Sequence, residues 1–191
     1  MEHQLHFEMP VNPDTLKVPT SKAIFPITRF HHFHKNANIN YQLNRFLIYG
    51  LEEVFTQIGH QIENFDDWKR LFFAKASSYE EEGRMDYAMA LYRAVEFFIS
   101  PQDPDKMFAY EKFISLFYRG REGHNVVQIK VPYSSGHLHG FRFTPFSPGE
   151  GTIIIHGGFD SYSEELYSLG MSFCETGYEV IIFDGPDKAS L

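Results

Sequence analysis

The sequence predicts an α/β protein in which a helical segment precedes a short run of strands. From Tyr41 onwards, apolar residues recur every three or four positions, which is the spacing of amphipathic helices. After Gly123 this spacing gives way to a turn-linked pair of short runs and then to two continuous apolar runs. We therefore divide the chain into an N-terminal arm (1–40), a helical region (41–123) and an α/β region (124–191).

The arm is rich in Pro, His and Asn and shows no stable periodicity. Its prolines favour extended backbone or turns. They are Pro10, Pro13, Pro19 and Pro26. A cluster of imidazoles at His31, His32 and His34 could bind a metal, but no Cys or carboxylate accompanies it at ligand spacing. We interpret this cluster as a solvated or packed part of the arm and predict no metal site.

The helical region is predicted to contain consecutive amphipathic helices separated by glycine, aspartate and proline. Asp66 is a fair N-cap for one of them, and Gly59, Gly83 and Gly120 are plausible ends. The predicted spans are 41–58, 66–82, 86–100 and 103–120. We expect a small helical layer.

The α/β region begins with strands at 126–131 and 138–143, joined by the turn sequence Tyr133-Ser134-Ser135-Gly136. The apolar runs Thr152–Ile155 and Val180–Phe183 then enclose a helix, expected over about 163–176. Strand, helix and strand at this spacing form a βαβ unit with parallel strands. Because apolar residues follow one another in both runs, we expect these strands to be buried on both faces.

Composition limits the classes of function. The net charge is −8, from 17 basic and 25 acidic residues, which disfavours nucleic acid and anionic membranes as partners. No apolar run approaches the ~20 residues of a membrane span, and no secretory signal is visible at the N-terminus. The single cysteine, Cys174, excludes an intrachain disulfide and fits a reducing compartment. We expect a soluble, cytoplasmic protein.

The first apolar run of the βαβ unit ends at His156 and is followed by Gly157 and Gly158. Glycine allows backbone torsions and close approaches that a side chain would block. Backbone N–H groups near the start of a helix suit an anion, or a carbonyl oxygen that becomes negative during a reaction. The alternative is a glycine-rich turn between strand and helix without chemistry, of a kind that many parallel-sheet proteins contain.

At this point the chain resembles the α/β-hydrolases. The resemblance rests on the hairpin, the strand end IIIHGGFD, the following helix and GYEVIIFDGP, and it covers about Tyr41 to Pro186. The preceding helices narrow it to bacterial enzymes in which a helical lid precedes the hydrolase core, such as 2,6-dihydropseudooxynicotine hydrolase and FrsA-like esterases. It implies a lid over 41–123 and part of a hydrolase core over 124–191. It also implies a small-molecule substrate, cleaved at an ester or at a carbon–carbon bond next to a carbonyl by a Ser nucleophile with a His base, without a cofactor.

The resemblance assigns roles to the residues of the loop. Phe159 would donate its backbone N–H to the oxyanion, and Gly157 and Gly158 would shape the loop. Asp160 and Ser161 would orient the loop or cap the following helix. The histidine that ends the strand would be structural and not the general base.

The family pattern also requires a nucleophile in G-x-S-x-G, followed by an acid and a histidine. No serine fits: the nearest, Ser172, has Cys174 in place of the second glycine and falls within a predicted helix. Asp187-Lys188 departs from the glycine-rich turn that family members carry there. We therefore interpret the chain as a truncated or interrupted hydrolase that lacks the triad and is itself inactive. The alternative is a non-enzymatic module whose helical half binds a partner, with the strands as support.

In the hydrolase topology that the resemblance implies, the last strand lies between the second and third strands. The third strand, Thr152–Ile155, would then expose unpaired N–H and C=O groups along its outer edge. We expect homo-oligomers or aggregation through that edge.

The remaining candidates are assigned packing or surface roles. Core packing is expected for Phe97, Phe98, Phe113 and Phe117, which could alternatively line a pocket under the lid. Cys174 is interpreted as a small buried hydrophobe and Asp184 as a loop residue rather than the triad acid. Glu80–Glu82 are interpreted as a solvated helix end, and a zinc site at His137 and His139 would need further ligands.

Overall fold

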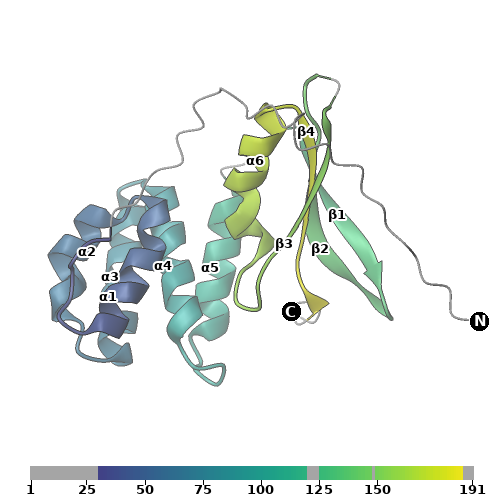
Figure 1. Cartoon of the computed structure of the whole chain (residues 1–191). Coiled ribbons are helices and arrows are strands. Elements are labelled where there is room, and N and C mark those ends of the chain that lie inside the picture. Colours follow the sequence, from purple (N-terminus) through teal and green to yellow (C-terminus); the bar gives the residue numbers. More distant parts are fainter. Residues whose placement is uncertain (1–29, 120–124, 148, 187–191) are drawn as a thin grey trace, which may run out of the picture.

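The computed structural model describes residues 30–119, 125–147 and 149–186. Within these ranges a layer of helices is followed by a β-sheet, with helix α6 between them (Figure 1). The helical layer comprises α1 (Ala37–Arg45), η2 (Phe46–Tyr49), α2 (Glu52–Ile58), η3 (Gly59–Gln61), α3 (Phe65–Glu81), α4 (Met85–Phe98) and α5 (Lys106–Arg119). The prolines of the predicted arm, the helix end at Gly120 and Asp187-Lys188 lie outside the described residues. None of the helices in these ranges combines the length and the apolar character that a membrane crossing requires.

The first predicted helix is wrong in both its start and its continuity. It begins at Ala37, because the Asn36 side chain accepts hydrogen bonds from the backbone N–H groups of Asn38 and Ile39 and so forms an N-cap. It is then broken at Gly50, whose φ of 75° lies in the left-handed region. The apolar spacing continues across this break, so periodicity alone predicted one helix.

The other predicted helices are confirmed, with corrected starts, and α5 begins at Lys106 rather than near Asp103. Asn64, rather than Asp66, is the N-cap of α3, since its side chain accepts from the Asp67 N–H at 3.0 Å. Helix α4 lies between α3 and α5 (Figure 1), and every residue from Ala88 to Glu96 is buried. The central position of α4 places even its polar side chains inside the protein.

The strands of the described ranges form one sheet in the order β1-β2-β4-β3. Their bounds are Val126–Tyr133 for β1, Gly136–Phe143 for β2, Gly151–His156 for β3 and Tyr178–Phe183 for β4. The β1–β2 hairpin is antiparallel, and β3 runs parallel to β4 with Ile154 beside Ile181. Between β3 and β4 the chain forms η4 (Ser163–Leu166) and α6 (Tyr167–Glu175). The predicted hairpin, the βαβ unit and the place of β4 between β2 and β3 are all confirmed.

Burial on both faces of the parallel strands was wrongly predicted. Phe143, Val180 and Ile182 are fully buried on the face that α6 covers. Ile154 of β3, by contrast, is 67% exposed. Among the described residues, the helices contact the sheet on this face, where α6 packs on β4 and β2 and Phe117 of α5 contacts Phe141. Ile154 lies on the opposite face and is therefore left exposed.

Gly140 provides a test of this sheet. A Cβ atom at Gly140 of β2 would lie 2.2 Å from the backbone oxygen of Ile182 in β4, whereas one at Gly136 of the same strand would meet nothing within 4 Å. We expect Gly140→Ala to lower the free energy of unfolding by about 2–3 kcal/mol, because the two strands must separate. Gly136→Ala should change it by about 0.5 kcal/mol or less. Urea denaturation of both variants measures the difference, and equal costs would contradict this strand pairing.

Candidate functional site

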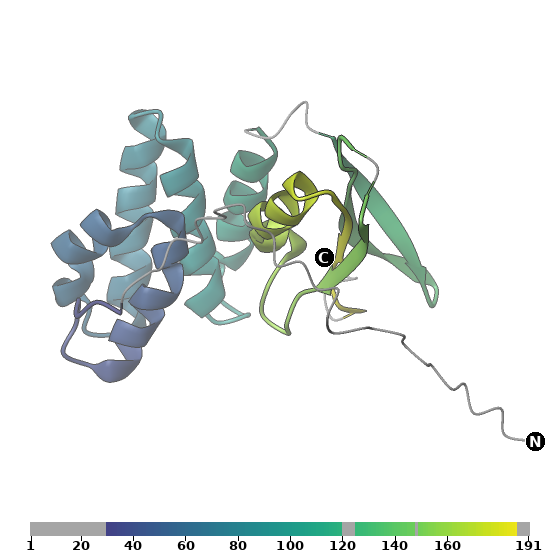
Figure 2. The ribbon, with the colours of Figure 1, turned by 45° about the horizontal axis from the view of Figure 1, so that its top comes forward.

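The loop after β3 turns towards the helical layer (Figure 2). Gly157 is closely packed, since a Cβ there would lie 2.6 Å from the Ser161 hydroxyl oxygen and 3.2 Å from the Ser161 backbone oxygen. A Cβ at Gly158 would meet only the Asp160 carboxylate, at 3.7 Å. Ser161 closes the turn, with its backbone N–H and its hydroxyl both 3.4 Å from the Gly158 carbonyl oxygen. The loop is therefore a tight turn with little room for a side chain at its first glycine.

Phe159 lies at the tip of this turn. Its residue surface is 86% exposed, and its backbone N–H donates no hydrogen bond to any residue of the described ranges. It also lies outside the β3–β4 ladder, whose last pair is His156 with Phe183. An unpaired N–H at the surface is available to an incoming acceptor. Within the described ranges, the backbone N–H singled out by the sequence thus has no hydrogen-bond partner.

Two arginines of the helical layer hold Asp160, the next residue of the loop. Arg45 of α1 donates to the Asp160 carboxylate at 2.9 Å, and its guanidinium lies 4.1 Å from the centre of the Phe97 ring. Arg93 of α4 donates to the Asp160 carbonyl oxygen at 2.5 Å. Burial raises the pKa of Asp160, but the hydrogen bond and charge of Arg45 outweigh it, so this pKa lies below its ordinary value. The carboxylate therefore remains charged at neutral pH.

Arg93 is the central residue of a buried charge network. Only 1% exposed, it donates to Glu96 of its own helix and to Glu165 of η4 at 2.8 Å. Glu96 also accepts from the Tyr162 hydroxyl at 3.2 Å and pairs with Lys106 at 2.9 Å. A buried charge requires such partners, because transferring it from water without them is costly. The network fastens Asp160 of the loop and Glu165 of η4 to α4.

A second buried cluster lies where α5, β2, η4 and the end of β4 meet. The Tyr118 hydroxyl donates to Glu164 at 2.9 Å and lies 3.0 Å from His139 Nε2. Asp184 accepts from the Ser163 N–H at 2.7 Å and lies 3.3 Å from its hydroxyl. The hydrogen bond to Glu164 raises the pKa of His139. Burial, reinforced by the charge of Glu164, raises the pKa of Asp184 to about 6.

Asp160, Ser161 and His156 were predicted to orient the loop, to cap the following helix or to be structural. Asp160 and Ser161 orient the loop but do not cap the following helix. The cap comes from Glu165, whose carboxylate accepts from the Tyr162 N–H at 2.9 Å. A glutamate in the first turn can reach back to the chain entering the helix, so it replaces the caps that we predicted. His156 places Nδ1 2.8 Å from the Gly157 carbonyl oxygen, a local contact.

The other candidates lie apart from the loop. Ser172 is inside α6, with its hydroxyl donating to Ser168, as its position in a predicted helix required. Cys174 is buried, as predicted, and burial raises the pKa of its thiol. Phe113 and Phe117 are core residues, again as predicted. Glu80 corrects one prediction: it accepts from Lys112 and Tyr92 instead of facing solvent.

The histidine cluster near the arm has local partners. His31 stacks on Phe33 with ring centres 5.3 Å apart and pairs with Glu52 at 3.3 Å. His34 is buried and accepts from the Asn36 N–H at 2.9 Å. Across the described ranges, no group of three or more His, Cys, Asp or Glu side chains is arranged to hold a metal ion.

Sequence reasoning missed Arg93 and the two buried carboxylates of the second cluster. One signal for Arg93 was present in the segment ALYRAVEFF. Arg93 and Glu96 are one helical turn apart, and all the other faces of the helix are apolar or aromatic, which indicates a buried ion pair. Glu164 gave no such signal, because its sequence neighbourhood is that of an exposed helix start.

No family model matches the chain. Hydrolase acrC of Aspergillus aculeatus is 34% identical to it over 118 residues, which cover 51% of this chain and 28% of acrC. The 20-hydroxy-prefusarin hydrolase FUS2 of Gibberella moniliformis is 32% identical over 108 residues, covering 51% and 26%. The solved structure of wild-type AbyA5 has a TM-score of 0.57 at 13% identity, covering 78% of this chain and 45% of that one.

The chain is α/β-hydrolase-like. The sequence similarity to the hydrolase-named relatives covers about half of the chain. The similarity to AbyA5 concerns the fold alone. The predicted α/β-hydrolase-like relationship is therefore confirmed over about half of the chain, as is the predicted order of a helical region followed by a sheet. The chain spans about a quarter of the length of the curated relatives it matches.

Proposed function

We propose that this chain forms the oxyanion-binding side of a serine hydrolase that acts on an ester, or on a carbon–carbon bond next to a carbonyl. The proposal rests on the Phe159 N–H, which donates to no residue of the described ranges and lies on a tight turn fixed to the helical layer through Asp160. The hydrolase names of acrC and FUS2 support the reaction class. The two glycines, Gly157 and Gly158, shape the turn.

In this mechanism the carbonyl oxygen of a small-molecule substrate becomes negative when a nucleophile attacks its carbon. A backbone N–H that is already held in place stabilises this charge without reorganisation, which is the main source of rate enhancement at such sites. Arg45 and Arg93 would provide that rigidity by fixing the side chain and the carbonyl of Asp160. The serine nucleophile is not supplied by these 191 residues, which contain no G-x-S-x-G, so we expect no turnover by the chain alone.

Binding of phenylphosphonate tests the Phe159 donor, because this dianion resembles the tetrahedral oxyanion. In ¹⁵N-labelled protein we expect the Phe159 amide resonance to move in a saturable way as phenylphosphonate is added. Phe159→Pro removes the N–H and should weaken binding about tenfold or more, the usual cost of losing a hydrogen bond to a charged group. Phe159→Ala keeps the N–H and should bind as the unchanged chain does. Equal binding by both variants would contradict the proposal.

We also propose that β3 associates with a second copy of the chain. In the described ranges β3 pairs with β4 on one side only, and Ile154 is exposed beside its outer edge. The opposite edge strand, β1, carries Lys130 and Pro132, residue types that discourage strand pairing, whereas β3 carries neither.

Light scattering at increasing concentration tests this association. We expect the chain to dimerise and Ile154→Lys to shift it towards monomer, because a charge beside the edge opposes pairing. Val127→Lys places the same charge at an exposed position of β1 and should leave the dimer unchanged. A monomer at all concentrations, with slow amide exchange along β3, would count against the proposal.

A further inference from the structure

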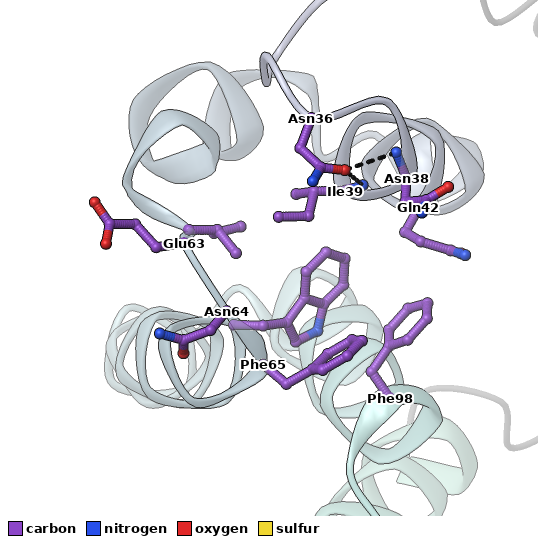
Figure 3. A pocket seen from close by; sticks show the side chains of 10 residues that line it. Asn36, Asn38, Ile39, Gln42, Glu63, Asn64, Phe65 and Phe98 are labelled. Carbon is purple, nitrogen blue, oxygen red and sulfur yellow. Dashed lines mark hydrogen bonds between the residues drawn. The ribbon is translucent and has the colours of Figure 1, made fainter.

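The helical layer contains a cavity of about 400 Å³ that no residue of the sheet lines (Figure 3). Its walls come from α1, from the segment that joins η3 to α3, from the start of α3 and from the last residue of α4. Small-molecule sites in proteins measure about 300–1,000 Å³, are mostly apolar and carry a few polar groups. The size of this cavity is within that range.

The floor of the cavity is aromatic. Phe98 packs edge-on to Trp68, with ring centres 4.8 Å apart, and stacks with Phe65 at 6.2 Å. The Trp68 indole N–H donates to the Ala94 carbonyl oxygen at 3.0 Å, so the indole offers only its hydrocarbon surface. Phe65 remains 66% exposed although it belongs to this stack. Trp68 itself is only 2% exposed, so the uncovered part of this aromatic surface belongs to Phe65 and the half-buried Phe98. A flat apolar molecule would extend the stack there.

All but one of the polar side chains around the cavity are amides. Asn36 and Asn64 use their side-chain oxygens as the N-caps of α1 and α3, and Glu63 is the one lining side chain that carries a charge. Since neither Lys nor Arg lines the cavity, it is unsuited to an anion.

Gln42 is the unusual member of this set. Its side-chain oxygen is buried and accepts no hydrogen bond from any residue in the described part of the chain. A buried acceptor without a partner is unfavourable. Its terminal torsion is soft, so a half turn of the amide would exchange its oxygen and nitrogen. After this half turn the oxygen occupies the position of the amide nitrogen, where the hydrogen-bond donor of a ligand could reach it.

We infer that this cavity binds a small, neutral, aromatic molecule that carries one hydrogen-bond donor. Its ring lies against Phe65 and Phe98, next to the buried Trp68, and its O–H or N–H donates to the Gln42 oxygen. This inference is independent of the proposed hydrolase function, because none of the lining residues belongs to the loop after β3. It assigns a ligand site to the helical layer itself.

N-Phenyl-1-naphthylamine is a suitable probe, because it is neutral and aromatic and has a single N–H. Trp68 is the only tryptophan of the chain, so its emission reports on the cavity directly. We expect saturable binding at one site, with quenching of Trp68 emission and sensitised emission from the probe. The N-methylated probe, which lacks the donor, should bind about threefold to tenfold more weakly.

Two variants locate the site. Gln42→Leu should reduce the preference for the N–H probe at least threefold. Ile39→Phe places a ring in the cavity and should weaken both probes at least tenfold, whereas Met107→Phe, at an exposed position of α5, should change neither. If Ile39→Phe fails to fold, the Gln42→Leu result still decides. Absence of saturable binding, binding that leaves Trp68 emission unchanged, or an undiminished preference in Gln42→Leu each overturns the inference.

Discussion

Replacing Arg93 by methionine is expected to lower the free energy of unfolding by about 3–5 kcal/mol, the usual cost of breaking a buried ion pair from one side. Arg93 is 1% exposed and compensates the carboxylates of Glu96 and Glu165. Methionine has a similar length but leaves both carboxylates without this partner. It also leaves the Asp160 carbonyl oxygen without its donor, so the loop loses its attachment to α4. Urea denaturation followed by circular dichroism measures the cost.

Arg45→Met is the matched control, since it removes the other arginine that contacts Asp160. The side chains of this pair are 36% and 47% exposed, so the expected cost is about 1 kcal/mol or less. Adding Glu165→Gln to Arg93→Met should recover part of the loss, because one uncompensated charge is removed. An equal loss of unfolding free energy in Arg93→Met and Arg45→Met would show that burial does not determine how strongly each arginine holds Asp160.

The order of helices and strands could be predicted from the sequence because each element carries its own periodicity. The place of β4 between β2 and β3 followed from the hydrolase resemblance and is confirmed. Two errors have a common cause. The break at Gly50 and the exposed Ile154 both depend on what packs against a segment, and an apolar pattern does not specify its neighbours.

The loop residues of the candidate site could be predicted from the sequence, but the side chains that hold the loop in place could not. Gly157 and Phe159 were identified because glycine after a buried strand is a local signal. Arg93 stabilises the same loop through Asp160, which is 67 positions away in the sequence. The two residues come together only when the chain folds. Asp184 was interpreted as a loop residue, yet it is buried against Ser163 and Glu164 because the end of β4 lies beside η4.

Asp184 is expected to make the protein more stable as the pH falls from 7 towards 4. Burial, together with the Glu164 charge, raises its folded pKa to about 6, above the ordinary value of 3.8 for an aspartate in an unfolded chain. A carboxyl whose pKa is raised on folding binds its proton more tightly in the folded state. Its stabilising contribution is therefore complete below pH 4 and is lost as the pH rises through about 6. A shift of about two units corresponds to about 3 kcal/mol.

Asp184→Asn isolates this contribution, because asparagine does not titrate. The free energy of unfolding of this variant, relative to the unchanged chain, should fall by about 3 kcal/mol between pH 7 and pH 4. His139 has a raised pKa and contributes a slope of the same sign. The Asp184 charge is one cause of that raised pKa, so Asp184→Asn also reduces the His139 slope and the two effects add. Asp160→Asn is the opposite control, since the pKa of Asp160 is lowered and its contribution is lost in acid. A difference between Asp184→Asn and the unchanged chain that stays constant with pH would mean that the Asp184 carboxyl is as well solvated in the folded chain as in the unfolded one.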